Sequence, residues 1–278
     1  MTRFGFAFNP TNEQARAALD RARGWCAANG IEAWDAEADD GDRIAAECVG
    51  SDLICVLGGD GTFLRAARGI GDSAAPTLGV NLGRVGFLAK VETGDLEQAL
   101  GKVAGGDFTL EDRFRIEATL IRAGGDREGH ACLNEVVVAR GPRVRMIQVE
   151  VEVSGSHLAT WVSDGVVVAT PTGSTAYSFS AGGSVLDPRL RNMIITSVAG
   201  YLSPLRSVVA GEDHVVRLTL RQAVSGATIS IDGQWDMPMA VGEAVEVRAL
   251  PVPLRMVELS GGTPFYDLLR TKASLLPY

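Results

Sequence analysis

The 278-residue chain is poor in cysteine, in histidine and in positive charge. Its four cysteines form no C-x-x-C pair and fit no zinc-ligand spacing, so neither a zinc centre nor a disulfide framework is expected. Because the net charge is −8 at pH 7, the chain gains no general attraction to nucleic acid or to an anionic membrane, and we predict neither as a partner. Its apolar runs are shorter than the ~18 residues that a membrane-spanning helix needs.

The N-terminus lacks the features of a secretory signal. Residues 1–8 alternate in the manner of a β-strand and contain no continuous apolar segment. Cys55 lies within an apolar run, as expected of a small buried residue, and cysteines outside any disulfide pattern suit a reducing compartment. We therefore predict a cytoplasmic protein.

Two familiar nucleotide-binding motifs are missing. The chain contains no G-x-x-x-x-G-K-[ST] sequence, which excludes a P-loop. Residues 69–74 fit G-x-G-x-x-A, but they end a predicted helix instead of following a strand, so they are not a Rossmann fingerprint. A nucleotide site in this chain must use another loop.

Strands and helices alternate through the first third of the chain. Apolar residues recur at helical spacing over 15–25, and Thr11 is expected to begin a capping box for that helix. Short continuous apolar strands are typical of a parallel sheet that is covered on both faces. We predict a Rossmann-like α/β domain over residues 1–107. Its strands are expected at residues 4–8, 52–57 and 76–80.

The remainder of the chain alternates with a period of two. Val149, Val151 and Val153, for example, alternate with glutamates, and glycine- and proline-bearing turns separate many such segments. This pattern predicts an all-β, sandwich-like domain over residues 108–261. A final helix within 262–278, with Pro264 at its first position, is expected to return to the N-terminal domain.

A glycine-rich loop, Gly58-Gly59-Asp60-Gly61-Thr62, lies between a predicted strand and a predicted helix that starts at Thr62. Ligands bind at this edge of α/β sheets, and a helix N-terminus favours phosphate. A carboxylate among these glycines repels phosphate unless it accepts a proton or holds Mg²⁺, and both are parts of phosphoryl transfer. The alternative is a tight turn in which Asp60 only caps the helix.

Four further polar segments follow in order. They are an N-x-G-x-x-G-F-L segment at 81–88, Asn134-Glu135, a long Thr- and Ser-rich segment at 164–183, and D-G-Q at 232–234. A carboxylate–amide pair such as Glu135 and Asn134 can bond vicinal hydroxyl groups, and Tyr177 can stack on a ring. The alternatives are a turn residue at Asn134 and an ordinary connection at 170–180.

The five segments together resemble the NAD kinase family, in the family's own order and over nearly the whole chain. The resemblance implies an enzyme that transfers the terminal phosphoryl group of ATP to the 2′-hydroxyl of the adenosine ribose of NAD. It also implies Mg²⁺ without a direct protein ligand, and a homodimer or homotetramer.

Residue roles follow from the same resemblance. It implies that Asp60 is the general base and that ATP phosphates lie against the glycine-rich loop. Arg65 is a candidate phosphate contact, with a solvated helix charge as its alternative. Val162 departs from the Arg or Lys that many relatives place two residues before the Asp-Gly pair. The implied nucleotide- and dinucleotide-binding residues are Gly58, Gly59, Gly61, Thr62, Arg65, Phe87, Asn134, Glu135, Asp164, Thr175, Ala176, Tyr177, Ser178, Ser180 and Gln234.

Two other functions compete with this interpretation. A lipid kinase can carry the same loop, but this chain shows no basic amphipathic stretch for a membrane surface. A dinucleotide sensor without catalysis would be expected to lose its base first, and Asp60 is present. Both alternatives are therefore disfavoured.

Overall fold

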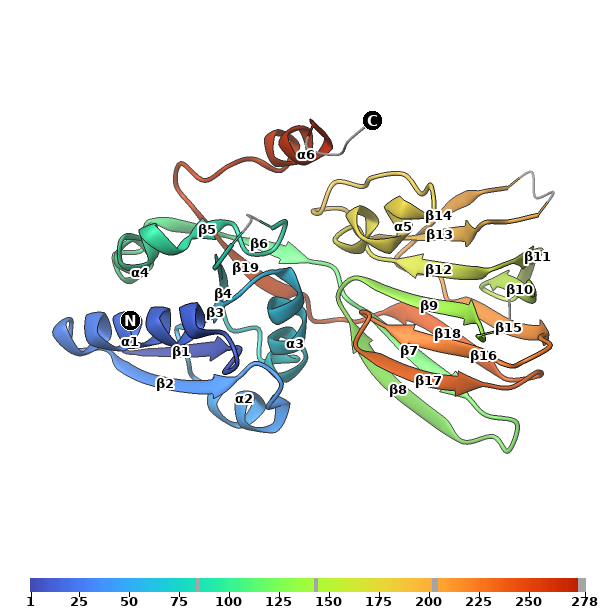
Figure 1. The fold of residues 1–278 in the computed structure, drawn as a ribbon, viewed down its shortest axis with the longest axis horizontal. Helices are drawn as coiled ribbons and strands as arrows, with labels where there is room; N and C mark the ends of the chain where they lie inside the picture. The colour runs from blue at the N-terminus through green and yellow to red at the C-terminus, as the bar shows by residue number, and fades with distance from the viewer. Residues whose placement is uncertain (84–85, 143–144, 202–204, 275–278) are drawn as a thin grey trace. The chain divides into compact units, whose positions relative to one another are not determined.

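The computed structural model describes residues 1–83, 86–142, 145–201 and 205–274. The chain forms two compact units (Figure 1). The α/β unit comprises Met1–Asp112 and the chain from Leu254 onward, and the β unit comprises Arg113–Pro253.

The α/β unit is built on a seven-stranded sheet in the order β2-β1-β3-β4-β19-β6, with β5 beside β4. The pairings of β1 with β2 and β3, and of β4 with β3, β5 and β19, are parallel. The strands are β1 (Arg3–Phe8), β2 (Glu32–Glu37), β3 (Leu53–Leu57), β4 (Thr77–Asn81), β5 (Val91–Glu92), β6 (Phe108–Arg113) and β19 (Leu254–Leu259).

Helices cover this sheet because its central strands are apolar throughout. All five residues of β3 are buried, as expected for a strand between two helical layers. The helices α1 and α4 share one core cluster with β1, β3 and β4, whereas α2 and α3 contact each other. The helices of this unit are α1 (Glu13–Ala28), α2 (Gly41–Cys48), α3 (Asp60–Ile70), α4 (Leu96–Ala104) and α6 (Phe265–Ser274), with a 3₁₀ turn η1 (Thr93–Asp95).

The β unit contains two six-stranded sheets in which all neighbouring strands are antiparallel. Alternate residues of both sheets meet in one apolar core, which includes Val149 and Val151 of the first sheet and Val136, Val138 and Val166 of the second. This is the sandwich that the period-two pattern predicts.

In sheet order, the first sheet is β11 (Ser156–Ser163), β10 (Ile147–Val153), β15 (Val216–Gln222), β18 (Ala244–Ala249), β7 (Ile116–Ile121) and β8 (Arg127–Cys132). The second is β14 (Ser207–Gly211), β13 (Asn192–Val198), β12 (Gly165–Ala169), β9 (Glu135–Arg140), β16 (Ala227–Ile231) and β17 (Trp235–Met239). A 3₁₀ turn η2 (Gly173–Thr175) and a short helix α5 (Tyr177–Ser180) follow β12.

Two expectations about boundaries differ from the structure. The units divide after Asp112 and before Leu254, whereas the sequence pattern placed the divisions after residues 107 and 261. The difference arises because β6 and β19 alternate like strands of the sandwich but join the sheet of the α/β unit. The first helix is capped by Asn12, whose side chain accepts from the N–H groups of Gln14 and Ala15, and not by Thr11.

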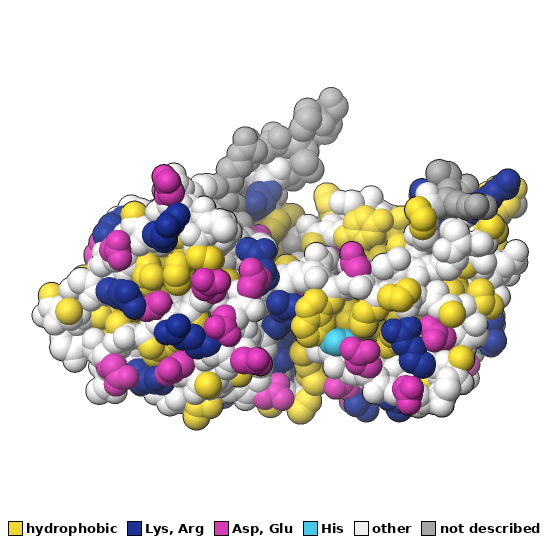
Figure 2. All heavy atoms as spheres, turned by 60° about the horizontal axis from the view of Figure 1, so that its bottom comes forward, with side chains coloured by type: hydrophobic (Ala, Val, Ile, Leu, Met, Phe, Trp, Pro, Cys, Tyr) yellow, Lys and Arg dark blue, Asp and Glu magenta, His cyan; other side chains and the backbone are white. Residues whose placement is uncertain are grey.

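Charges of both signs are interspersed on the face that Figure 2 shows. Several of the surface charges form ion pairs, such as Arg21 with Glu97 and Arg127 with Glu246. The four cysteines are all free and buried, in agreement with the sequence. Within the described ranges, no helix combines the length and apolar character needed to cross a membrane.

Candidate functional site

The glycine-rich loop follows β3 and leads directly into α3. The N–H group of Gly58 donates to the Val80 carbonyl at 2.9 Å, and a Cβ atom at Gly58 would lie 2.5 Å from Cβ of Thr62. In contrast, a Cβ atom at Gly59 or Gly61 would meet no protein atom within 4 Å. The loop is therefore closely packed on one side and open on the other, where a ligand can approach its backbone.

The N-terminus of α3 is not capped by a side chain. The helix begins at Asp60, two residues earlier than expected, and its cap residue is Gly59. Because glycine offers no side-chain oxygen, the cap leaves the N–H groups of the first turn available. These groups and the helix dipole make the start of α3 suitable for phosphate.

Asp60 does not cap its own helix, which was the alternative to a chemical role. Its Oδ2 accepts from the N–H of Phe87 at 2.9 Å, and its Oδ1 accepts from Leu88 and Ala89 at 3.0 and 3.1 Å. A Cβ atom at Gly86 would lie 1.8 Å from Oδ1 of Asp60, so only glycine fits there. With two donors on Oδ1 and one on Oδ2, the free acceptor position of the carboxylate is on Oδ2.

Three predicted contacts near the loop have protein partners. Arg65 lies with its Nε 3.0 Å from Oδ1 of Asp39, and its Nη2 donates to Oγ1 of Thr62 at 3.2 Å. The Arg65 side chain is thus 29% exposed and paired with Asp39 through its Nε atom. The ring of Phe87 packs on Phe265 of α6, with ring centroids 5.9 Å apart. Arg84 and Val85 of the same segment lie outside the described residues.

In the β unit, the carboxylate of Asp232 organises the backbone that carries Asn134 and Glu135. Its oxygens accept from the N–H groups of Leu133, Asn134 and Glu135 at 2.9, 2.7 and 3.1 Å. The Cys132 thiol also donates to Oδ1 of Asp232, at 2.9 Å. Asp232 belongs to the D-G-Q segment at 232–234, but it was not predicted as a site residue.

The side chains of Asn134, Glu135 and Gln234 leave polar atoms buried. Among the described residues, no group donates to or accepts from Oδ1 of Asn134, Oε2 of Glu135 or Oε1 of Gln234. Burial, followed by the negative charge of Asp232, raises the pKa of Glu135 to about 8. The backbone N–H of Tyr177 opposes this shift by hydrogen-bonding the carboxylate. Unpartnered buried polar atoms are costly, and a ligand or water could supply the missing hydrogen bonds here.

The Thr- and Ser-rich segment packs against the same backbone. The Thr170 hydroxyl donates to the Leu133 carbonyl at 2.5 Å, and the Thr170 N–H donates to the Asn134 carbonyl at 2.8 Å. A Cβ atom at Gly173 would lie 2.2 Å from that Asn134 oxygen. The segment is thus fixed beside Asn134 and Glu135, and it leaves the ring of Tyr177 42% exposed.

Other predicted residues of this segment have different surroundings. Ser178 is fully buried, with its hydroxyl 3.2 Å from that of Thr196, so it stabilises the segment and is not open to a ligand. The Thr175 hydroxyl donates to the Thr172 carbonyl at 3.2 Å. Ala176 is partly buried and Ser180 is exposed.

Asp164 is not brought to this cluster. It precedes β12, whereas Glu135 pairs with Ala169 at the other end of that strand. Five residues of strand separate the two positions by roughly 17 Å. The Asp164 carboxylate instead accepts from Nε of Arg140 at 2.9 Å. The sequence could not reveal this, because it does not show that β9 pairs with β12 or in which direction the two strands run.

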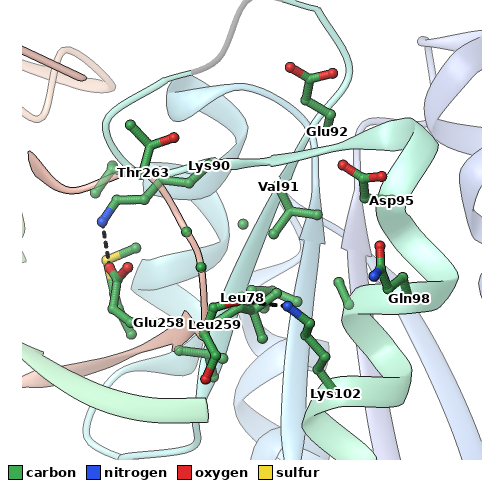
Figure 3. Close-up of a pocket in the computed structure, with 18 residues that line it drawn as sticks. Leu78, Lys90, Val91, Glu92, Asp95, Gln98, Lys102, Glu258, Leu259 and Thr263 are labelled. Atoms are coloured by element: carbon green, nitrogen blue, oxygen red, sulfur yellow. Dashed lines mark hydrogen bonds and ion pairs between the residues drawn. The ribbon is translucent and has the colours of Figure 1, made fainter. Parts of the chain in front are cut away.

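A separate cavity of about 340 Å³ lies within the α/β unit, among β4, β5, α4 and β19 (Figure 3). Lys90 donates to Glu258 at 2.5 Å and Lys102 donates to the Ser260 carbonyl at 2.7 Å, so both lysines are engaged by the protein. The cavity contains none of the predicted site residues, although its wall includes Leu88, which holds Asp60.

An α/β unit with an open helix N-terminus, joined to a β-sandwich with a carboxyl–amide pair, is the architecture of a nucleotide-dependent phosphotransferase. The ATP-NAD kinase N-terminal domain model matches residues 5–108, and the ATP-NAD kinase C-terminal domain model matches residues 133–259. The chain belongs to the NAD kinase family.

Individual relatives agree with this assignment. An NAD kinase from Heliobacterium modesticaldum is 43% identical over 80% of this chain and 78% of its own length. An NAD kinase from Syntrophotalea carbinolica is 36% identical over 90% of both chains. Among solved structures, the chain shares its fold with yeast NADH kinase complexed with NADH, at a TM-score of 0.85 and 21% identity over 99% of this chain and 87% of that one. It also shares its fold with an NAD kinase from Archaeoglobus fulgidus in complex with ATP. The TM-score is 0.81 and the identity is 23%, over 99% of this chain and 100% of that one.

Proposed function

We propose that this chain transfers the terminal phosphoryl group of ATP to the 2′-hydroxyl of the adenosine ribose of NAD, which produces NADP. The observation that carries this proposal is the adjacent pair Asn134 and Glu135, with a buried unpartnered oxygen on each side chain among the described residues. Neighbouring polar groups of this kind can bond the two vicinal hydroxyls of a ribose.

The protonation state of Glu135 determines how the pair recognises a hydroxyl. With a pKa of about 8, this carboxyl is mostly neutral at pH 7 and carries a proton that it can donate. The Asn134 Oδ1 can only accept. A neutral Glu135 beside Asn134 therefore offers one hydrogen-bond donor and one acceptor. This pair matches two hydroxyl groups, each of which can donate or accept a hydrogen bond.

In the transfer step, Asp60 accepts the proton of the attacking 2′-hydroxyl on its Oδ2 atom. The ribose oxygen forms a bond to the γ-phosphorus while the bond from that phosphorus to the β–γ bridging oxygen breaks and ADP leaves. The N–H groups of residues 87–89 hold the carboxylate in place, so little reorganisation is needed when the proton arrives.

The backbone of Gly59, Gly61 and Thr62 holds the ATP phosphates at the start of α3. A divalent cation such as Mg²⁺, bound together with these phosphates, would supply positive charge that offsets the negative charge of the transferred group. Among the described residues, no group of three or more His, Cys, Asp or Glu side chains is placed to hold a metal ion. Arg65 is proposed as a phosphate contact, and a contact through its Nε atom would require this atom to leave Asp39.

We further propose that Thr175, Ala176, Ser180 and Gln234 line the dinucleotide pocket and that Tyr177 stacks on a ring of the substrate. The exposed Tyr177 ring and the unpartnered Gln234 oxygen among the described residues support these roles.

The protein is proposed to act in the cytoplasm as a homodimer or homotetramer. The β14 and β17 strands lie at the edges of their sheet and offer backbone groups for association. Light scattering that found only monomer at working concentrations would contradict the oligomer.

The reaction is tested by incubating the purified protein with NAD, ATP and Mg²⁺ and by quantifying NADP with an NADP-specific dehydrogenase. NADP should accumulate with the natural protein and not with Asp60→Asn. If no NADP forms with active controls and with other phosphoryl donors, the proposed reaction is wrong.

A further inference from the structure

The Asp232 side chain joins two parts of the β unit that are distant in sequence. It lies in the turn between β16 and β17, and its contacts reach back 97 to 100 residues to Cys132, Leu133, Asn134 and Glu135. Its own N–H donates to the Glu135 carbonyl at 2.9 Å. The turn and the Asn134–Glu135 backbone are therefore bonded to each other in both directions.

The conformation of Asp232 is specialised for these contacts. It has a φ of +51°, in the left-handed region that few residues other than Gly, Asn and Asp adopt. Asp232 is also 8% exposed, so its four donors replace the water that a carboxylate would otherwise bind. Burial of Cys132, followed by the negative charge of Asp232, raises the pKa of its thiol well above the usual value, so the thiol keeps the proton that it donates.

We propose that Asp232 is a positioning residue for the dinucleotide site, which fixes the backbone of residues 133–135 without touching the substrate. The inference rests on the proposed function, because it assigns Asn134 and Glu135 to NAD. It adds that the β16–β17 turn determines how this pair is presented.

Charge gives Asp232 an effect that packing alone would not have. The titratable groups facing Glu135 are Asp232, from the β16–β17 turn, and Cys132, from the end of β8. Because Cys132 stays neutral, Asp232 supplies the negative charge that disfavours ionisation of Glu135. Removing this charge should let Glu135 ionise at lower pH.

Asp232→Asn is the most informative variant. Asparagine tolerates the left-handed conformation, so the turn is retained, but the charge and one acceptor are lost. The matched control is Asp236→Asn, which changes an exposed residue of the same hairpin. Steady-state kinetics of both variants should be measured from pH 6 to pH 9.5, with NAD and ATP varied in turn.

For Asp232→Asn we expect the KM for NAD to rise about tenfold while the KM for ATP changes by less than about threefold, since a lost buried contact of ~1.4 kcal/mol corresponds to a factor of ten. The pH at which the KM for NAD begins to rise should move down, and Asp236→Asn should behave like the natural protein. If Asp232→Asn only lowers kcat, with the KM for NAD and its pH dependence unchanged, the residue is structural and the proposal fails.

Hydrogen exchange provides a readout that does not require catalysis. The amides of residues 133–135 should exchange more slowly in the natural protein than in Asp232→Asn, while amides of the α/β unit stay unchanged. Equal protection in both would overturn the positioning role, whereas absence of NADP from the natural protein would overturn only the proposed reaction. If Asp232→Asn does not fold, Cys132→Ala removes one of the four donors, and unchanged exchange together with an unchanged KM for NAD would overturn the proposal.

Discussion

Asp60 combines a proposed chemical role with an observed structural contact. Three N–H groups occupy its carboxylate, so Asp60→Asn removes the base and also turns an amide group toward at least one of these donors. We expect turnover to be abolished, the Kd for NAD to stay within about tenfold, and the free energy of unfolding to fall by ~1–3 kcal/mol. Single-turnover assays, calorimetric titration and denaturant unfolding would measure these effects. Loss of NAD binding in a folded variant would identify Asp60 as a binding residue instead.

Glu135 is expected to give the proposed dinucleotide site a pH dependence. Since its folded-state pKa is about 8, its proton is lost as pH rises through that value. If the neutral form binds the ribose, the Kd for NAD should rise about fivefold between pH 8 and pH 9, and about tenfold between pH 6 and pH 9, because the carboxyl is half ionised at its pKa. Titration calorimetry across this range would measure the change, and Glu135→Gln should remove the dependence. A Kd that is constant to pH 9 in the natural protein would show that the ionised form binds equally well.

The same shift affects the stability of the folded chain. The pKa of Glu135 is raised from 4.5 to about 8, so the folded state holds this proton over a pH range in which the unfolded state has lost it. The stability linked to Glu135 is therefore fully present below pH 4.5 and is lost as pH rises through about 8.

At the scale of an element, the loop between β3 and α3 has one closely packed glycine and one open glycine. Gly58→Ala places a methyl group against Thr62 and should lower the melting temperature. Gly59→Ala meets no protein atom within 4 Å, so it should fold normally while its methyl group occupies the proposed phosphate position and raises the KM for ATP. Kinetics and thermal unfolding of the two variants separate these effects. A normal KM for ATP in Gly59→Ala would place the phosphates elsewhere.

Elements defined by local patterns could be predicted from the sequence. The spacing of apolar residues within a short segment predicts the β3 strand and the alternating strands of the sandwich, and it indicates which face is buried. The loop after β3 could be predicted from its glycines in the same way. The start of α3 was misplaced by two residues because glycine and aspartate are poor helix formers, although both suit a first turn next to an open phosphate position.

Features that depend on contacts distant in sequence could not be predicted. The strand β19 pairs with β4 across more than 170 residues, and nothing local distinguishes it from a sandwich strand. For the same reason the sequence suggested no partner for Asp232, whose donors lie about a hundred residues earlier. Asp164 was grouped with Glu135 because both belong to conspicuous motifs. Strand register instead places Asp164 just before the start of β12 and pairs Glu135 of β9 with the last residue of β12.

At the scale of the whole molecule, the two units divide the proposed reaction between them. Asp60, the proposed base, and the proposed phosphate-binding helix α3 belong to the α/β unit, whereas Asn134 and Glu135, the proposed ribose-binding pair, belong to the β unit. This division implies that binding and chemistry can be impaired separately, because Asp60 and Glu135 belong to different units, each with its own core.

Thermal unfolding in the presence of NAD provides a test of this division. A ligand that binds only the folded state stabilises it by ~2.7 kcal/mol at one hundred times its Kd, which raises the melting temperature by a few degrees in a chain of this size. We expect saturating NAD to stabilise the natural protein and Asp60→Asn to similar extents, and to stabilise an Asn134→Ala variant much less. Asp236→Asn serves as the control in the β unit and should respond like the natural protein. If Asn134→Ala keeps the full shift while Asp60→Asn loses it, the dinucleotide is held mainly by the α/β unit and the assignment of roles is reversed.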